Sequence, residues 1–208
     1  MSVLNQLASA LGRRDEVPNQ ELAKRIVAKN DKAAVKELVE NLKSKKKDIQ
    51  ADCIKTLYEA GYEKPALIAP YHKEFLGLLK SKNGRMIWGG MTALSTIVTE
   101  NSKVIFDYLP EIMEAADGDS VIAKDHAAKI LTILSADRKY SKTTLPLLID
   151  FINAAPENQF PTYAENVFPV LDAMGKKALQ QVLESRVGEM TSATKRKRVE
   201  KLLKKLGK

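Results

Sequence analysis

The sequence has little of what disulfide frameworks, metal centres and fibrous proteins require. Its 208 residues include one cysteine, Cys53, and two histidines, His72 and His126. A single cysteine excludes an intramolecular disulfide and any cysteine-rich zinc site, and two histidines leave little for a metal centre or a histidine-based triad. Ten glycines and eight prolines are too few for collagen-like or low-complexity sequence. We therefore expect neither a metal nor another cofactor.

Long apolar runs are missing as well. No window reaches the ~18 uninterrupted apolar residues that a membrane-spanning helix needs. Residues 1–14 lack the basic start, the long apolar core and the small-residue cleavage site of a secretory signal. Together with the lone cysteine, these absences favour a cytoplasmic location and no membrane span.

The composition that is present is typical of a folded soluble protein. Apolar residues make up 44% and charged residues 29%, which excludes wholesale disorder. The length suits one compact domain or one modest repeat array. We expect a single domain over residues 1–208, with cap helices at 1–31, a repeat body at 32–190 and a basic helix at 191–208.

A spacing of apolar residues at i, i+4, i+8 and i+11 recurs along the chain. Successive copies begin 37, 37, 40 and 32 residues apart, and at 3.6 residues per turn each copy occupies one helical face. The second position is small in three copies, which permits close helix approach. No segment alternates with a period of two, so a β-sheet is not expected. The copies are Ile49/Cys53/Leu57/Ala60, Met86/Gly90/Leu94/Ile97, Ala123/Ala127/Leu131/Leu134, Tyr163/Val167/Leu171/Met174 and the weaker Lys195/Val199/Leu203/Leu206.

Another helix is predicted before each of these copies. Three of these first helices carry a proline at matching places, Pro70, Pro110 and Pro146. Proline fixes φ and has no amide donor, so it fits the first turn of a helix or bends a longer one. The predicted first helices cover residues 32–44, 66–81, 103–116, 141–155 and 176–190.

The segments between and before the helix pairs have their own signals. The turns within the pairs are short and polar, and residues 3–11 and 21–28 are predicted as two extra helices. They would cap the first repeat, because an end repeat exposes an apolar face. Suitable cap or turn residues are Asp48, Asn83, Asp119 and Ser120.

Paired antiparallel helices, a period near 37 to 40 residues and a proline in the first helix resemble HEAT-type repeats, or more loosely armadillo-like arrays. The resemblance covers residues 32–206, although the arginine usual in the second HEAT helix is not regular here. It implies an all-α fold, a right-handed α-α superhelix (solenoid) of about five helix pairs with an N-terminal helical cap. It also implies a concave ligand surface lined by the second helices.

The predicted register places the outer residues of the second helices in rows across this concave surface. Trp88 is the only tryptophan, and an exposed Trp is a typical binding anchor. The alternative is that Trp88 packs between repeats as core. Lys55 and Lys129 lie in another row and are expected to be solvated. The residues predicted to form the binding groove are Trp88, Asp125, His126, Glu165 and Asn166.

Several distinctive residues are expected to be structural. Gly89 and Gly90 are unusual inside a helix, and we expect them to make room for a neighbouring helix rather than for a ligand. Cys53 occupies a small apolar slot, which predicts a buried thiol with a raised pKa and no role as a nucleophile. Asp125 and His126 are adjacent, so they point about 100° apart on a helix and do not form a ready-made dyad. A solvated or capping His126 is favoured over a general base.

The net charge is concentrated at the C-terminal end. Residues 191–208 hold eight Lys/Arg against one acid, Glu200, and so carry +7 of the total +8. Val199, Leu202, Leu203 and Leu206 form an apolar stripe, which suits a terminal capping helix with a solvated basic face. The alternative is weak, salt-sensitive contact with nucleic acid or another acidic surface. The residues predicted for polyanion contact are Lys195, Arg196, Lys197, Arg198 and Lys201.

Two classes of function remain open. The sequence has no phosphate-binding glycine loop, HExxH pair, GxSxG elbow or Cys/His cluster. We therefore favour a non-catalytic binding scaffold whose groove holds a protein partner. The alternative is a nucleic-acid-binding protein or a DNA-repair glycosylase, since bacterial DNA alkylation repair glycosylases use HEAT-like repeats with aromatic and carboxylate groups in a concave groove. Trp88 and Asp125 suit that pairing, but the motif is not matched residue by residue, and the near-neutral body argues against it.

Overall fold

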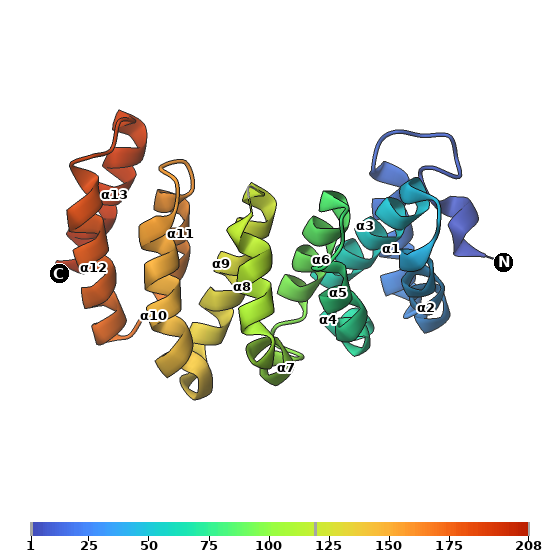
Figure 1. Ribbon diagram of the computed structural model, residues 1–208, viewed down its shortest axis with the longest axis horizontal. Coiled ribbons are helices and arrows are strands. Elements are labelled where there is room, and N and C mark those ends of the chain that lie inside the picture. The colour runs from blue at the N-terminus through green and yellow to red at the C-terminus, as the bar shows by residue number, and fades with distance from the viewer. Residues whose placement is uncertain (1, 119, 208) are drawn as a thin grey trace. The chain divides into compact units, whose positions relative to one another are not determined.

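Every regular element in the described part of the chain, residues 2–118 and 120–207, is helical (Figure 1). The computed structural model therefore confirms the all-α repeat fold. The chain forms two compact units, residues 1–127 and 128–208, and the division falls within helix α9 (Val121–Ala136). None of the described helices combines the length and apolar character needed to cross a membrane. Asp119, predicted as a cap or turn residue, lies outside the described residues.

The first unit contains the N-terminal segment and the first three helix pairs. Helix α3 packs against α1 and α6, and α6 also packs against α5. Its elements are η1 (Val3–Gln6), α1 (Val17–Lys29), α2 (Lys32–Glu40), η2 (Asn41–Lys43), α3 (Lys47–Glu63), α4 (Pro65–Ile68), η3 (Ala69–Tyr71), α5 (His72–Leu78), α6 (Gly84–Thr96), α7 (Ser102–Asp107), α8 (Leu109–Asp117) and the start of α9.

The second unit contains two further helix pairs. Helix α12 packs against α10 and α13, while α11 packs against α10 and α13. The elements are α10 (Arg138–Ala154), α11 (Phe160–Val167), η4 (Phe168–Val170), α12 (Ala173–Val187) and α13 (Ala193–Leu206).

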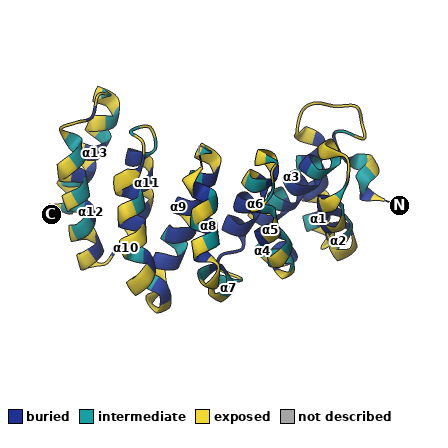
Figure 2. Ribbon diagram, viewed as in Figure 1, coloured by how far each residue is buried: buried dark blue, intermediate teal, exposed yellow. Residues whose placement is uncertain are grey.

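The repeated apolar face is buried in the second helices of the first three pairs. Leu57, Leu94 and Leu131, at the third position of the spacing, are fully inaccessible to solvent. Figure 2 shows the result as buried bands that alternate with exposed bands along the helices. Burying a leucine side chain stabilises a fold by about 1.5–3 kcal/mol, so this recurring position accounts for much of the packing between helices.

The fourth copy of the apolar spacing does not lie in one helix, so the prediction was wrong at the end of this copy. Helix α11 stops at Val167, and the chain continues into the short 3-10 segment η4, which contains Pro169. Proline cannot donate the next helical hydrogen bond and restricts the residue before it. Met174 therefore falls in the next helix, α12, where it is 81% exposed.

Proline also divides or bends the predicted first helices. The helix expected over residues 66–81 is split into α4, η3 and α5, with Pro70 in η3. The helix expected over 103–116 is split into α7 and α8, and Pro110 lies in the first turn of α8. Pro146 lies inside the unbroken helix α10. The prediction of continuous first helices was therefore wrong for two of the three.

The N-terminal segment and one cap also differ from expectation. The extra helix predicted over residues 3–11 is only the short 3-10 helix η1 followed by turns, whereas the one predicted over 21–28 lies within α1. Asp48 lies in the first turn of α3, where Lys46 takes the cap position, so its predicted capping role is wrong. Asn83 does cap α6, since its Oδ1 accepts from the Arg85 N–H at 3.1 Å.

Gly89 and Gly90 allow two neighbouring helices to approach α6 closely. A Cβ at Gly89 would overlap Cγ1 of Ile54 and lie 2.8 Å from its Cγ2, on α3. A Cβ at Gly90 would lie 3.0 Å from the carbonyl oxygen of Phe75, on α5. Both glycines therefore make room for helices, as predicted, at the place where α3 and α6 build a common surface.

A candidate ligand groove in the first unit

The N-terminal loop, residues 7–16, is held against α1 and α3 by a partly buried network of hydrogen bonds. Leu7 and Ala8 are buried apolar anchors. Asn19 accepts from the Ala8 N–H at 3.0 Å and donates to Asp52 Oδ1 at 2.7 Å. The other carboxylate oxygen of Asp52 accepts from the Ser9 N–H at 2.7 Å. Gly12, with φ of 68°, provides the left-handed turn that the loop needs.

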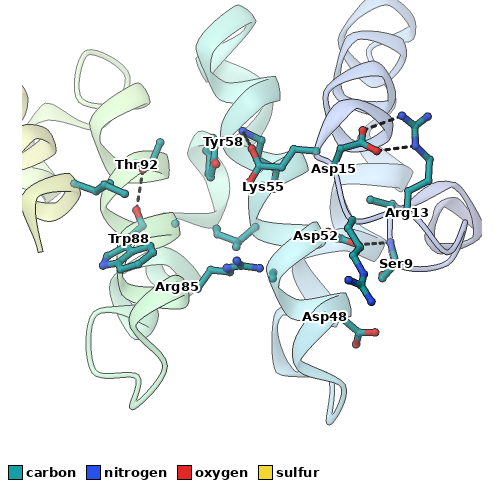
Figure 3. Close-up of a pocket in the computed structure, with 17 residues that line it drawn as sticks. Ser9, Arg13, Asp15, Asp48, Asp52, Lys55, Tyr58, Arg85, Trp88 and Thr92 are labelled. Atoms are coloured by element: carbon teal, nitrogen blue, oxygen red, sulfur yellow. Dashed lines mark hydrogen bonds and ion pairs between the residues drawn. The ribbon is translucent and has the colours of Figure 1, made fainter.

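This loop, α3 and α6 line an open groove with a volume of about 450 Å³ (Figure 3). Ile122, at the start of α9, completes the lining. The full set of lining residues is Ala8, Ser9, Arg13, Arg14, Asp15, Glu16, Asp48, Ala51, Asp52, Ile54, Lys55, Tyr58, Arg85, Trp88, Gly89, Thr92 and Ile122.

Trp88 stands in this groove as its largest exposed apolar side chain. It is 38% exposed, and its indole ring lies over Gly84, where an added Cβ would be 3.8 Å from the ring. Ile122 is also exposed, at 43%. An aromatic face that remains open to solvent beside a second apolar residue is suited to bind an apolar ligand group. The alternative prediction, Trp88 as core between repeats, is therefore wrong.

Most acidic groups of the groove are already paired. Asp15 accepts two hydrogen bonds from the Arg13 guanidinium, at 2.8 and 2.9 Å, and these lower the pKa of its carboxyl. Glu16 and Glu59 each lie 2.7 Å from Lys55 Nζ. Burial acts to lower the pKa of Lys55, but the hydrogen bonds to these two carboxylates outweigh it and raise the pKa.

Lys55 is therefore not the solvated residue that the spacing predicted. Its side chain is only 12% exposed, and its ammonium group lies 4.9 Å from the centre of the Tyr58 ring. Burial raises the pKa of the Tyr58 hydroxyl. The prediction for Lys55 was wrong because the N-terminal loop, which carries Glu16, covers this part of α3.

Two arginines of the groove have no such partner. Arg14, in the N-terminal loop, and Arg85, in the first turn of α6, are both exposed. Neither guanidinium makes an ion pair or hydrogen bond to another residue in the described part of the chain. Figure 3 shows Arg85 extending from α6 toward α3.

Of the residues predicted to form the groove, Trp88 alone lies in it. Asp125 and His126 are on α9 but are not among the lining residues, and His126 Nδ1 lies 2.9 Å from Ser95 Oγ. Glu165 and Asn166 belong to α11 in the other unit. There Glu165 pairs with Arg198 at 2.6 Å, and this hydrogen bond lowers the pKa of Glu165.

The basic helix α13 uses three of its predicted polyanion contacts internally. Arg198 binds Glu165 through two nitrogens and also donates to Thr162 Oγ1 at 3.0 Å. Lys195 donates to Asn158, and Arg196 donates to the Met190 carbonyl. Four exposed lysines of α13 make no hydrogen bond or ion pair with another described residue, although Lys201 and Lys205 lie near enough to Glu165 to help lower the pKa of its carboxyl. These lysines, Lys197, Lys201, Lys204 and Lys205, share one helical face at i, i+4, i+7 and i+8.

The groove offers charge and an aromatic surface rather than an activated catalytic group. In the described residues, no three His, Cys, Asp or Glu side chains are grouped to hold a metal ion. Cys53 is fully buried, and burial raises the pKa of its thiol to about 12. The thiol is therefore protonated at neutral pH, as the sequence predicted.

Sequence reasoning missed the loop residues and Arg85. Spacing places residues of one helix relative to those of the next, so it gave no position to an irregular N-terminal loop. The run Arg13, Arg14, Asp15, Glu16 is a visible mixed-charge signal, but only the fold brings it beside α3 and α6.

No family model and no curated relative matches the sequence. Solved structures do resemble the fold. A designed armadillo repeat protein in complex with the peptide (KR)4 has a TM-score of 0.68 at 14% identity, covering 99% of this chain and 100% of that one. Another designed armadillo repeat protein has a TM-score of 0.66 at 13% identity, covering 98% and 99%.

A natural protein is among the similar structures as well. The archaeal HEAT-like repeats protein from Thermococcus onnurineus NA1 has a TM-score of 0.50 at 13% identity, covering 93% of this chain and 97% of that one. At such identities the likeness concerns the fold alone. The chain is thus an all-α solenoid of HEAT/armadillo-like helical repeats.

Proposed function

We propose that the protein is a non-catalytic binding scaffold that holds a segment of a protein partner in the groove of the first unit. The observation that carries the proposal is the solvent-exposed Trp88 in an open groove of about 450 Å³. Tryptophan, tyrosine and arginine dominate the binding energy of protein interfaces, and this groove presents Trp88 with Arg14 and Arg85. The setting of the proposed scaffold is the cytoplasm.

The volume and the walls of the groove suit a short extended segment. An open groove with one large aromatic anchor and two available arginines offers the residue types that dominate binding to a protein segment. The designed armadillo protein that binds the peptide (KR)4 illustrates that a fold of this class can hold a peptide. In our proposal the repeats form a rigid frame, so little conformational entropy is lost on binding.

The experiment is a peptide selection followed by titration. A displayed library of random 12-residue peptides would be selected on the full chain, and binders would be titrated by tryptophan fluorescence. Trp88 is the only tryptophan, so the signal reports on the groove itself. We expect Trp88→Ala to weaken selected peptides by at least tenfold, the loss typical of a central aromatic anchor.

A matched control separates the groove from general stickiness. Tyr108 is an aromatic residue of similar exposure, 44%, that does not line the groove. Tyr108→Ala should leave the affinity of the selected peptides unchanged. The affinity of the Trp88→Ala variant would be measured by the anisotropy of a labelled peptide. Selected peptides that bind this variant as tightly as the unchanged chain would contradict the proposal.

A second candidate function rests on the exposed lysine face of α13. We propose weak, sequence-independent nucleic-acid contact through Lys197, Lys201, Lys204 and Lys205. A labelled oligonucleotide should bind in about 50 mM salt and dissociate by about 200 mM. Changing the four lysines to glutamine should abolish binding, whereas the single change Arg198→Gln should weaken it less, because Arg198 is already paired with Glu165.

A further inference from the structure

Some charged side chains of the groove are paired within the protein and others are not, and this difference indicates which ligand the groove accepts. Asp15 and Glu16 are paired with Arg13 and Lys55. Asp52 accepts hydrogen bonds from both Ser9 and Asn19. Only the cations Arg14 and Arg85 reach the groove without a protein partner in the described residues. Asp48 also lines the groove and forms no ion pair among the described residues, so the groove is not positive overall. Its two available guanidinium groups are instead separate positions at which a ligand carboxylate can pair.

The two arginines lie beside the apolar anchor. Arg85 and Trp88 are three residues apart on α6, so their side chains leave the same face of the helix. Arg14 belongs to the N-terminal loop, and α3 lies between this loop and α6 (Figure 3). A ligand that crosses the groove would meet a guanidinium from each wall, with the indole of Trp88 close to one of them.

We propose that the groove binds an acidic peptide segment, whose carboxylates pair with Arg14 and Arg85 and whose apolar or aromatic side chain packs on Trp88 and Ile122. Guanidinium groups bind carboxylates through two parallel hydrogen bonds, which adds direction to the charge attraction. This inference rests on the proposed function, since it specifies the peptide that the groove would hold. The sign of the ligand charge is opposite to that of the (KR)4 peptide in the similar designed protein.

A polynucleotide fits these charges less well. The phosphates of a nucleic acid repeat at every nucleotide, and proteins meet them with a continuous row of cations. Here Asp48, whose carboxylate lies in the first turn of α3, and Asp52 lie among the lining residues. They would repel a phosphate at every nucleotide, whereas a peptide can place its carboxylates at the two arginines and an uncharged residue beside these acids. Two separate arginines with acids between them are better matched to two separate carboxylates.

The test is a charge reversal read out by the composition of selected peptides. Peptides selected on the unchanged chain should be enriched in Asp and Glu together with Leu, Phe or Trp. Selection on the double variant Arg14→Glu/Arg85→Glu should reverse the charge preference to Lys and Arg and keep the apolar preference. An acidic peptide from the first selection should lose about tenfold in affinity for Arg14→Gln/Arg85→Gln, as expected for two partly exposed charge pairs.

The control variant loses two positive charges, as Arg14→Gln/Arg85→Gln does, but outside the groove. Lys24 and Lys29 are exposed on α1 and do not line the groove, so Lys24→Gln/Lys29→Gln should leave the affinity unchanged. All four altered side chains are exposed, and circular dichroism should show an unchanged melting curve for each variant.

Each outcome decides between the two proposals. Peptides that need Trp88 but show no acidic enrichment, or an enrichment that the charge reversal does not alter, would overturn the acidic-peptide inference and leave the scaffold function standing. Absence of any Trp88-dependent peptide would overturn both. Trp88-dependent binding of an oligo(dT) probe that outcompetes the acidic peptides would overturn the inference in favour of a nucleic acid.

Discussion

Helix α13 and the groove of the first unit differ in how far their cations are paired within the protein. In helix α13, which holds most of the net positive charge, Lys195, Arg196 and Arg198 all make contacts within the second unit. In the groove of the first unit, where the sequence is nearly neutral, Arg14 and Arg85 have no partner in the described residues. A count of charges along the sequence therefore overstates the charge that a ligand can reach on α13, where only Lys197, Lys201, Lys204 and Lys205 are exposed without a hydrogen bond or ion pair to another described residue, and it misses the two available arginines of the groove.

The cause of the difference is the position of the carboxylates. Glu165 on α11 lies opposite Arg198, and Glu157 accepts hydrogen bonds from Thr191 and Ser192 just before α13 begins. Three of the four acids that line the groove with Arg14 and Arg85 are instead bound by Arg13, by Lys55 or by the Ser9 N–H and the Asn19 side chain, and the fourth, Asp48, accepts from the Ile49 N–H. A basic cluster is available to a ligand only where the fold has not already paired it.

The largest effect should come from closing the approach between α3 and α6. Gly89→Ala would force a methyl group onto Ile54, which is itself buried, and we expect a loss of about 1–3 kcal/mol in the free energy of unfolding. Displacement of α6 would also move Arg85 and Trp88, so binding in the groove should weaken. Urea denaturation monitored by circular dichroism measures the first effect.

Gly77→Ala provides the matched control for that change. Gly77 lies inside α5, and a Cβ there would meet no atom within 4 Å. Alanine favours helix over glycine by up to about 1 kcal/mol, so this variant should be as stable as the unchanged chain or more so. Equal destabilisation by both substitutions would contradict the close approach of α3 and α6.

A pair of neighbouring cations on α13 tests whether its charge is structural. Arg198→Gln removes the contact with Glu165, and we expect a loss of about 1 kcal/mol or less because both side chains are about 40% exposed. Lys197→Gln makes the same change of charge one residue away and should stay within about 0.5 kcal/mol. A double-mutant cycle with Glu165→Gln should give a coupling energy for Arg198 and none for Lys197. Equal effects of the two single variants would contradict the internal use of Arg198.

The second unit and the groove should both lose stability in acid, because Asp15 in the groove also has a lowered pKa, and the groove should in addition lose stability in alkali through Lys55. Hydrogen bonds from Ser192 and Thr191 lower the pKa of Glu157, and the hydrogen bond from Arg198 lowers that of Glu165. A carboxyl whose pKa is lower in the folded state stabilises the fold above its unfolded pKa of about 4.3, and this stabilisation is lost as the pH falls through the folded pKa. Lys55 has a raised pKa, so its contribution is complete below about pH 10.4 and is lost only as the pH rises further.

Carboxyl titration by NMR would measure these pKa values directly. The midpoints of Glu157 and Glu165 should lie below the ordinary value for glutamate. Glu157→Gln should flatten the decrease of stability in acid, whereas Glu189→Gln, at an exposed residue of the same unit, should leave its slope unchanged. A normal midpoint for both carboxyls would show that α13 is not held by them.

The all-α repeat could be predicted from the sequence because its signal is local. Leu57, Leu94 and Leu131 recur at nearly equal intervals, and helical geometry alone places them on one face. The break after Val167 was also signalled locally, by Pro169, but the apolar spacing of Leu171 and Met174 masked it. Helix ends depend on competition between such signals, so they are the less certain part of the prediction.

The groove could be predicted only in part. Trp88 was identified because a single tryptophan on a predicted outer face is conspicuous. Arg14, Glu16 and Lys55 were not placed together, because a loop of irregular backbone has no period from which a position follows. Contacts between residues about 40 positions apart, such as Glu16 with Lys55, depend on how the loop folds back over α3.

The smallest effect should come from the loop itself and shows which group holds Arg14 in place. The Ser9 hydroxyl is buried and has no hydrogen-bond partner among the described residues, whereas the Ser9 N–H donates to Asp52 at 2.7 Å. An unpaired buried hydroxyl costs free energy that its removal recovers, so Ser9→Ala should leave the free energy of unfolding unchanged or raise it by up to about 1 kcal/mol. Because the bond from the Ser9 backbone to Asp52 remains, the loop and Arg14 should keep their positions, and the affinity for acidic peptides should not change.

The contrasting variant Asp52→Ala removes the acceptor instead, so it should both destabilise the fold and lower the affinity for the peptide. If Ser9→Ala lowered the affinity for the peptide as much as Asp52→Ala does, the Ser9 hydroxyl and not the Asp52 carboxylate would hold the loop. The position of Arg14 would then depend on a contact of that hydroxyl that the structure does not show.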